Sequence, residues 1–371
     1  SLLTARLARP AIASGAVAGD LSGFVRLEPR IDTALAAEQL ARVGLPADYV
    51  RWISVNEARA RTGLPVDSGG WFYAQAGWLS PGDWSRWLLG RAVSVGLARF
   101  QGVTQVAALR RGPDGGWQAL DAQGRVLAQA PVVVLATAMA VERLLPEDAA
   151  PVQLQAVRGQ TTLLAADTPA LRPPRLALSG QGYGLTLPDG RVLTGATTQY
   201  GDTDPRVRAT DHTHNLARAA RLGVCVCATT TEVADMALTG RVGWRATTAD
   251  RLPLIGPPLD RRLPATAPTG KPRPTGLQHQ PRCHGATSGL YLFTGLGARG
   301  ITSAALGAQV LAAWVTGAPF PVDTALRDAL DPARQWTGRQ GEKKGGSAEP
   351  PCQTKESSGP RTPSDGKADA A

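Results

Sequence analysis

The sequence contains little cysteine and little histidine, four residues of each in 371. None of them completes the ligand spacing of a zinc site, so we expect no metal centre. Cys225 and Cys227 are too close together in the chain to form a disulfide framework. A reduced, cytoplasmic protein is therefore the default expectation.

Long hydrophobic runs are also missing. The longest candidate, residues 301–316, is shorter than the ~18 apolar residues of a membrane span and is rich in Ala, Gly and Ser, so we expect a buried helix and no membrane partner. Residues 1–15 (SLLTARLARPAIASG) lack an initiator methionine and the pattern of a signal peptide. We expect that the chain is truncated at its N-terminus.

Negative charge is scarce, and the net charge is +10. The last 34 residues carry six Lys and Arg against five Asp and Glu, which leaves nine excess positive charges in the rest of the chain. Two interpretations stay open with equal weight. The excess indicates a polyanionic partner such as RNA, or it reflects the arginine-rich codon usage of a GC-rich genome.

Two segments have compositions that do not predict regular structure. Residues 338–371 contain no aliphatic or aromatic residue beyond Ala, and we expect a disordered tail. Residues 264–287 are rich in Pro, Gly and polar residues, which predicts an insertion loop.

The remaining chain predicts a mixture of sheets and helices. Residues 132–138 (VVVLATA) form a continuous apolar run, which is typical of a strand buried on both faces in a parallel sheet. Alternating patterns at residues 100–109, 115–130 and 191–200 predict antiparallel hairpins. Helical patterns occur at residues 81–96 and 211–223. Asp211 is expected to be the N-cap of the second helix. The fold class that follows is α/β (α+β).

A strand, a glycine-rich loop and a helix are expected in order over residues 290–317. The loop contains Gly-x-Gly-x-x-Gly at Gly295, Gly297 and Gly300. The N-terminus of the following helix would offer unpaired N–H groups and partial positive charge to an electron-rich ligand. No strand carries the acidic residue that a dinucleotide site needs about 20 positions later. On this pattern alone, structural glycines and a ligand site are equally supported.

The order of several segments resembles the superfamily of FAD-dependent amine and amino-acid oxidases, which includes glycine oxidase and D-amino-acid oxidase. The segments are VVVLATA, VRGQTT (157–162), GWRATTADRLPLIG (243–256) and the glycine-loop segment. In that superfamily a late strand, glycine loop and helix hold the flavin ring. The resemblance implies FAD as the cofactor, bound by Gly295, Leu296, Gly297, Ala298, Arg299, Gly300, Ile301, Ala136 and Thr137.

A finer resemblance covers residues 2–334. LLTARLARP, GGWFYAQAGWLSPGDWSRWLL, VRGQ, GATTQYGDTDPRVRATDHTHNLARAARL, RATTADRLPLIG and GLGARGITSAALGAQVLA together resemble the oxidoreductase half of the MnmC family. This family makes 5-methylaminomethyl-2-thiouridine in tRNA. The resemblance implies a bacterial cytoplasmic enzyme with tRNA, not DNA, as its partner.

The implied reaction removes the carboxymethyl group from carboxymethylaminomethyl-uridine at the wobble position. Oxidation of the CH₂ group beside the amine, followed by hydrolysis, gives aminomethyl-uridine and glyoxylate. An S-adenosylmethionine-dependent methyltransferase acts next; that half is not in this chain, and we expect it as a fused or separate partner. The first βαβ unit of the FAD-binding domain is likewise missing, and TAMA replaces the usual glycine turn after Thr137.

The resemblance also implies site residues. Arg245 stands where the superfamily places the arginine that clamps the substrate carboxylate, and we favour this role over that of an ordinary surface arginine. Arg158 is a second catalytic candidate, with a structural ion pair as an equal alternative. Gln75, Gly77 and Trp78 match a family motif near the substrate, although Trp78 fits a core position slightly better.

The expected domain division is discontinuous. A Rossmann-like FAD-binding domain, incomplete at its N-terminus, would comprise residues 1–22, 80–150 and 285–335. It is interleaved with an antiparallel substrate domain of residues 23–79 and 151–263. Two alternative functions stay open: an oxidase or dehydrogenase of small amines or amino acids, and a truncated remnant without catalysis. A flavin absorbance would exclude the remnant, and activity on sarcosine but not on tRNA would favour the small-molecule enzyme.

Overall fold

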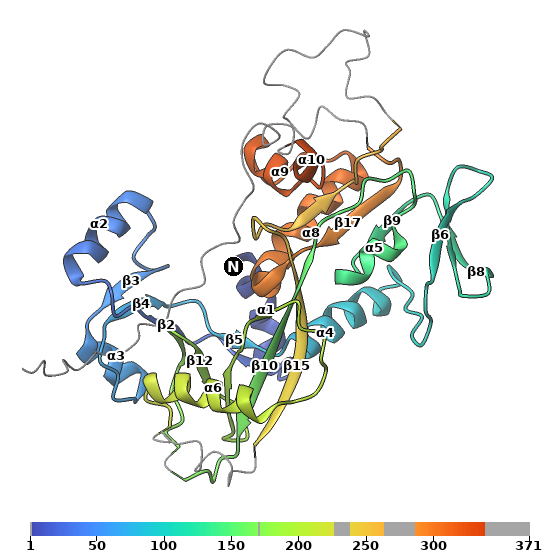
Figure 1. The fold of residues 1–371 in the computed structure, drawn as a ribbon. Helices are drawn as coiled ribbons and strands as arrows, with labels where there is room; N and C mark the ends of the chain where they lie inside the picture. The colour runs from blue at the N-terminus through green and yellow to red at the C-terminus, as the bar shows by residue number, and fades with distance from the viewer. Residues whose placement is uncertain (1, 170, 226–237, 263–285, 338–371) are drawn as a thin grey trace, which may run out of the picture.

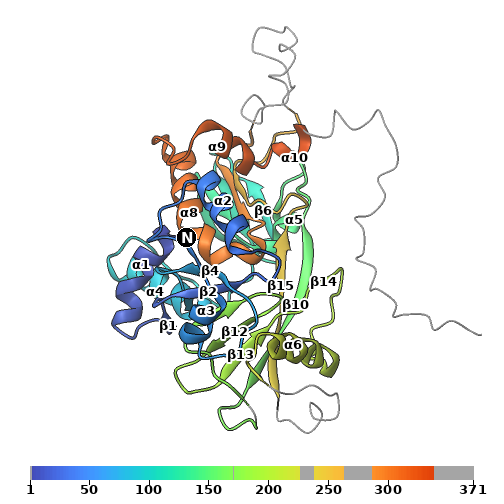
Figure 2. The same cartoon turned by 90° about the vertical axis from the view of Figure 1, so that its left-hand side faces the viewer.

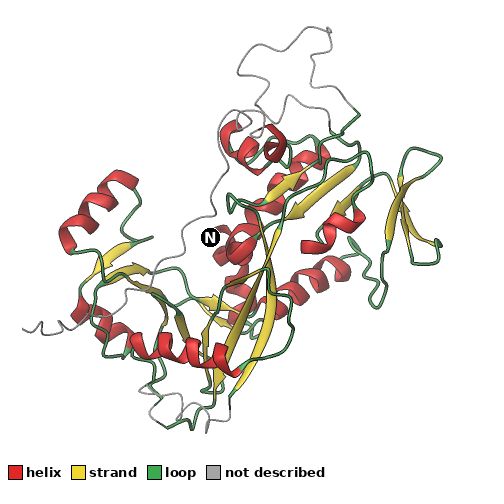
Figure 3. Cartoon of the chain, viewed as in Figure 1, coloured by secondary structure: helices red, strands yellow, loops and turns green. Residues whose placement is uncertain are grey.

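The computed structural model describes residues 2–169, 171–225, 238–262 and 286–337 (Figure 1). The described part contains several sheets flanked by helices, as the colouring by secondary structure shows (Figure 3). The expectation of a mixed α/β fold is confirmed. The insertion loop expected at residues 264–287 lies almost entirely outside the described residues, and the tail expected at residues 338–371 lies wholly outside them.

The largest sheet has nine strands and carries most of the antiparallel pairing. Its order is β14 (Gln199–Tyr200), β10 (Gln155–Leu164), β13 (Val192–Gly195), β12 (Tyr183–Thr186), β11 (Ala177–Ser179), β2 (Phe24–Leu27), β4 (Gly70–Tyr73) and β3 (Arg51–Ile53). The ninth strand, β15 (Thr239–Thr247), pairs with β10 over the whole length of β15. β11 and β2 pair in parallel, and the other neighbours pair antiparallel.

Helix α6 (Ala209–Arg221) lies along one face of this sheet (Figures 1 and 2). Its apolar residues are spaced to bury one stripe: Leu216 and Ala219 join Leu164 and Leu178 of the strands in a continuous core. Asp211 is not the N-cap that the sequence predicted. That position belongs to Arg208, and Asp211 lies inside the first turn, where its carboxylate pairs with a buried arginine on β10.

A smaller sheet contains the predicted parallel pair. Its strands are β16 (Leu254–Gly256), β17 (Leu290–Thr294) and β9 (Val133–Leu135), and β17 and β9 run parallel. Among the described residues β9 pairs with β17 alone, and Val134 is 40% exposed. The expectation that this run is buried on both faces was therefore wrong. After β9 follow η1 (Ala138–Ala140) and α5 (Val141–Leu144).

Helix α8 (Gly300–Thr316) packs on the small sheet and is preceded by η4 (Gly297–Arg299). Gly307 is necessary for this contact, because a Cβ atom there would lie 2.7 Å from the ring of Phe293. Only one stripe of α8 is buried, at Gly307, Val310 and Ala313. The sequence had predicted a buried helix, whereas only one side of α8 is buried in the structure.

The other elements surround these sheets. Helix α1 (Leu2–Ala13) packs on α8 and, through Ala8 and Ala11, against Trp84. The remaining elements are β1 (Gly19–Asp20), α2 (Thr33–Val43), α3 (Val55–Thr62), β5 (Trp78–Leu79), α4 (Pro81–Ser94), β6 (Ala108–Arg111), β7 (Trp117–Leu120), β8 (Val126–Ala130), α9 (Thr324–Leu330) and α10 (Arg334–Thr337). In the described part of the chain, no helix has the length and apolarity that crossing a bilayer requires. The expected division into two interleaved domains stays a prediction.

Candidate functional site

Strand β15 connects the large sheet to the glycine-rich loop. Arg245 lies near the end of this strand, and Thr247 forms an antiparallel bridge with Leu296 in the loop. The predicted carboxylate clamp and the predicted flavin loop are therefore joined through two residues of backbone. Nothing in the local sequence revealed this connection, because the two segments are 50 residues apart.

The glycine loop has the conformation that its glycines permit. Gly295 and Gly297 adopt positive φ angles of +70° and +54°, which other residues rarely adopt. Helix α8 then begins without a side-chain cap and without an acidic residue in its first turn. No side chain of the first turn therefore offsets the partial positive charge at the N-terminus of α8. The amide of Arg299 donates to Leu296 O at 3.1 Å, so it is not one of the free amides that we had expected.

Ala136 and Thr137 lie beside this loop. They follow β9, which is parallel to β17, so both segments leave the small sheet at its carboxyl edge. The hydroxyl of Thr294 donates to Ala138 O at 3.1 Å and joins the two turns. The crevice at the carboxyl ends of parallel strands is where open α/β sheets bind ligands. Ala138 has φ +49°, in the region that glycine favours.

Arg245 is half-buried on one face of the large sheet. Val157 of β10 pairs with Arg245 on one side and with Tyr200 of β14 on the other, so these three side chains point to the same face. The guanidinium leans over Gly159: a Cβ atom at that position would lie 2.8 Å from both Nη1 and Nη2. Gly243, opposite Gly159, has open space above it. We call Val157, Gly159, Tyr200, Gly243 and Arg245 the clamp face.

Arg245 has no counter-charge among the residues that the structure describes. Its one hydrogen bond to the described residues is a long one, 3.5 Å from Nη1 to Thr197 O. A half-buried arginine fork with unused donors is suited to bind a carboxylate through both oxygens.

Tyr183 is a site residue that the sequence reasoning missed. It pairs with Gly195, which pairs in turn with Thr161, so its side chain shares the face of Arg245. Burial raises the pKa of Tyr183 above its ordinary value, and the positive charge of Arg245 partly offsets this rise. Its phenol therefore stays neutral and can donate a hydrogen bond beside the guanidinium.

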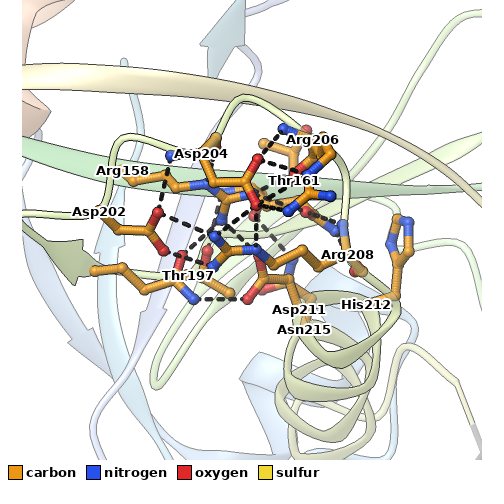
Figure 4. A network of polar contacts seen from close by, with 12 residues as sticks. Arg158, Thr161, Thr197, Asp202, Asp204, Arg206, Arg208, Asp211, His212 and Asn215 are labelled. Carbon is orange, nitrogen blue, oxygen red and sulfur yellow. Dashed lines mark hydrogen bonds and ion pairs between the residues drawn. The ribbon is translucent and has the colours of Figure 1, made fainter.

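Arg158 lies on the face of β10 opposite to Arg245, inside a network of polar contacts (Figure 4). It is fully buried, and each of its five N–H groups has an acceptor. The acceptors are Asp204 O, Arg206 O, Gln199 Oε1, Gln160 Oε1 and, at 2.6 Å, Asp211 Oδ2. Arg158 thus has no donor left for a substrate, and the ion-pair interpretation is the one that fits.

The same network fixes the loop that follows β14. The side-chain amide of Gln160 donates to Arg208 O and accepts from Arg208 N, both at 2.8 Å. Arg208 also pairs with Asp202 and Asp204. Hydrogen bonds from Arg206 first, and then from Arg208, hold the pKa of Asp204 well below its ordinary value. The hydrogen bond from Trp244 Nε1 to Asp202 O, at 2.8 Å, anchors the loop to β15 beside Arg245.

Gln75, Gly77 and Trp78 lie in and after the turn that leads into β5, which pairs with β1 in a separate two-stranded sheet. Gly77 has a packing reason, because a Cβ atom there would lie 1.8 Å from Asp20 O. Gln75 is exposed and Trp78 is half-buried, outside the described core clusters. No hydrogen bond within the described residues joins these three to Arg245, and their role in substrate binding stays a prediction.

Comparison with known proteins agrees with this geometry. The sequence model described as "FAD dependent oxidoreductase" matches residues 16–314. The chain belongs to the FAD-dependent oxidoreductase family. The family that the sequence resemblance indicated is thereby confirmed, and with it an enzyme class whose cofactor is FAD.

Relatives of this family member are bifunctional proteins. The protein of Methylibium petroleiphilum named "tRNA 5-methylaminomethyl-2-thiouridine biosynthesis bifunctional protein MnmC" is 45% identical over 339 residues, which are 90% of this chain and 50% of that protein. The protein of the same name from Ralstonia nicotianae is 38% identical, over 84% of this chain and 47% of that protein. The chain spans about half the length of these curated relatives.

Solved structures share the fold. Glycine oxidase from Geobacillus kaustophilus superposes with a TM-score of 0.63 at 22% identity, over 88% of this chain and 80% of that one. Iminodiacetate oxidase from Chelativorans sp. BNC1 superposes with a TM-score of 0.62 at 22% identity, over 87% of this chain and 82% of that one. At this identity the likeness concerns the fold alone.

Proposed function

We propose that the chain is the oxidoreductase part of a tRNA-modifying enzyme. It oxidises the carboxymethylaminomethyl group of the wobble uridine, with aminomethyl-uridine and glyoxylate as products. The observation that carries the proposal is the guanidinium of Arg245 on the clamp face, which has no counter-charge among the described residues and is joined to the glycine loop by the Thr247–Leu296 bridge. The names of the relatives supply the substrate class.

The residues at the glycine loop fit a flavin ring. Gly297 turns without a Cβ atom at positive φ, and α8 directs an uncapped, positively polarised end toward the carboxyl edge of the small sheet. FAD, when bound, would supply the acceptor for the two electrons that the carbon beside the substrate amine loses. We assign Gly295, Leu296, Gly297, Ala298, Arg299, Gly300, Ile301, Ala136 and Thr137 to its binding.

The chain's own residues then supply binding and orientation. Arg245 binds the substrate carboxylate through its fork, and Tyr183 donates a hydrogen bond to the same group from its neutral phenol. The carboxylate anchors a short arm, so the adjacent carbon is directed toward the glycine loop. The first turn of α8 stabilises negative charge that develops on an electron-rich group placed there.

The test is an assay of the purified chain, reconstituted with FAD, on tRNA that carries carboxymethylaminomethyl-uridine. We expect glyoxylate release and conversion of the nucleoside to aminomethyl-uridine, measured by mass spectrometry. Oxidation of sarcosine or glycine without conversion of tRNA would establish the small-molecule alternative instead. A chain that binds no FAD, with no flavin absorbance after reconstitution, would leave the non-catalytic alternative.

A S-adenosylmethionine-dependent methyltransferase is the partner that this function requires, because the product of the oxidation is an unmethylated amine. The bifunctional relatives are about twice as long as the region that they share with this chain. We propose that the methyltransferase acts after this chain, either fused to it or as a separate protein, in the cytoplasm where tRNA is modified.

A further inference from the structure

Tyr200 is an exposed aromatic residue at a fixed position beside Arg245. It is 62% exposed, and its hydroxyl has no hydrogen-bond partner within the described residues. The pairing of Val157 with both Tyr200 and Arg245 places the two side chains on one face, two strand spacings or about 10 Å apart. An aromatic ring at that position has no evident role in the core.

We infer that Tyr200 is the platform on which the uracil ring of the substrate nucleotide stacks. The inference rests on the proposed function, since it requires a substrate with a base at the end of the carboxylate arm. That arm, CH₂–NH–CH₂, spans about 5 Å between the ring carbon and the carboxylate carbon. With the carboxylate on Arg245, the base comes within reach of a side chain two strands away. Unpaired bases in RNA loops are bound by stacking on aromatic side chains.

Buried contacts hold Tyr200 in place on both sides. Before it, the side chain of Gln199 accepts from Arg158 at 2.6 Å and donates to Asp211 at 2.8 Å. After it, Arg158 donates to the backbone oxygens of Asp204 and Arg206. The buried network in Figure 4 therefore fixes the strand and the loop that flank the exposed ring. A side chain whose backbone is fixed in advance loses less entropy when it binds.

The inference also explains the placement of Arg158. This residue cannot contact the substrate, yet it lies on the strand between Tyr200 and Arg245 and bonds to the residues around Tyr200. We assign it the role of a positioning residue for the stacking platform.

The experiment compares Tyr200→Ala with Tyr200→Phe in the full chain loaded with FAD. The probe is an anticodon stem-loop RNA that carries carboxymethylaminomethyl-uridine, and the small-molecule reference is N-methylglycine. Phe100→Ala is the matched control, because Phe100 is a similarly exposed aromatic residue (67%) outside the large sheet. Affinity for the RNA is measured by fluorescence anisotropy, and KM and kcat are measured for both substrates.

We expect Tyr200→Ala to raise the Kd and the KM for the RNA about tenfold, which is typical for loss of one base stack, with kcat little changed. Tyr200→Phe should restore both values to within about twofold, because the ring is kept. The KM for N-methylglycine should not change, and Phe100→Ala should leave all values unchanged.

Three results would overturn the inference. Unchanged RNA affinity and KM in Tyr200→Ala would refute the stacking contact while the proposed function stands. An equal rise in KM for RNA and N-methylglycine would mean that Tyr200 acts on the carboxylate arm and not on the base. A wild-type enzyme that oxidises N-methylglycine but neither binds nor oxidises the RNA would refute the proposed function, and the stacking role with it.

Discussion

The guanidinium of Arg245 lies over Gly159, where the side chain of any other residue would begin. Both terminal nitrogens are 2.8 Å from the position of a Cβ atom on Gly159, closer than such atoms approach each other. The orientation of Arg245 thus requires glycine at position 159. A substitution at this position can therefore test the role of Arg245 without unfolding the sheet.

Gly159→Ala should therefore impair carboxylate binding without unfolding the protein. The atoms that clash belong to the end of a flexible side chain, so Arg245 can move away at little cost to stability. We expect the KM for carboxylate substrates to rise about tenfold, equivalent to roughly 1.4 kcal/mol, with FAD content and Tm unchanged. Gly90→Ala is the control, because Gly90 lies on α4, outside the large sheet, with open space around it. Equal KM values for the two variants would argue against the clamp.

The buried pair of Arg158 and Asp211 should be necessary for stability. Asp211→Asn leaves a buried guanidinium without its counter-charge, and we expect a loss of about 3–5 kcal/mol in the free energy of unfolding, measured with urea. Asp189→Asn, which breaks an exposed pair with Arg191, should leave the midpoint unchanged. A similar loss from Asp189→Asn would contradict this interpretation.

Asp331 should make stability fall as the pH rises. Burial raises the pKa of Asp331 to about 6, above the ~3.9 of an unfolded chain. The contribution of Asp331 to the free energy of unfolding is fully present below about pH 4 and is lost as the pH rises through about 6. Asp331→Asn keeps an acceptor for the amide of Ala333 and has no charge to bury. We expect the variant to be more stable than the wild type at pH 8, by roughly 3 kcal/mol at most, and equally stable at pH 4.

Thermal unfolding of the two proteins across this pH range checks the prediction. Other carboxylates contribute equally to both proteins, so the difference in Tm isolates position 331. A difference that is constant between pH 4 and pH 8 would show that the charge of Asp331 is not responsible.

Ala138→Gly should stabilise the turn after β9. Ala138 has φ +49°, a conformation that costs a residue with a Cβ atom about 1 kcal/mol more than glycine. The expected gain in Tm is about 2 °C for a protein of this size. Ala140→Gly, in the same segment but at φ −71°, should instead lower the Tm. Lower stability of both variants would contradict the interpretation of strain at Ala138.

Local pattern was sufficient to predict the elements around the glycine loop. The apolar run at residues 290–293, the glycine spacing and Gly317 at the end of α8 all concern neighbours in sequence, and the structure has β17, the loop and α8 in these places. The parallel pairing of β9 was predicted in the same way, from its composition.

Pairing register was not predictable, and the errors follow from this. Four of the five acceptors of Arg158 lie 41 to 53 residues further along the chain, so its sequence neighbours could not distinguish an ion pair from a catalytic role. The same holds for Asp211, whose carboxylate pairs with Arg158 on β10 and does not cap its own helix. Tyr183 and Tyr200 were missed because only the register of β10 with its neighbours places them on the face of Arg245.

The bridge between Thr247 and Leu296 has a consequence for the length of an acceptable substrate. Arg245 and Thr247 are two residues apart on one strand, about 7 Å along the backbone, and the bridge fixes the glycine loop at the second of these positions. A carboxylate on Arg245 would then present its own neighbouring carbon to the loop, and one more methylene would move the amine out of place. Substrates would thus be sorted by the number of carbons between amine and acid, through the backbone spacing of a single strand.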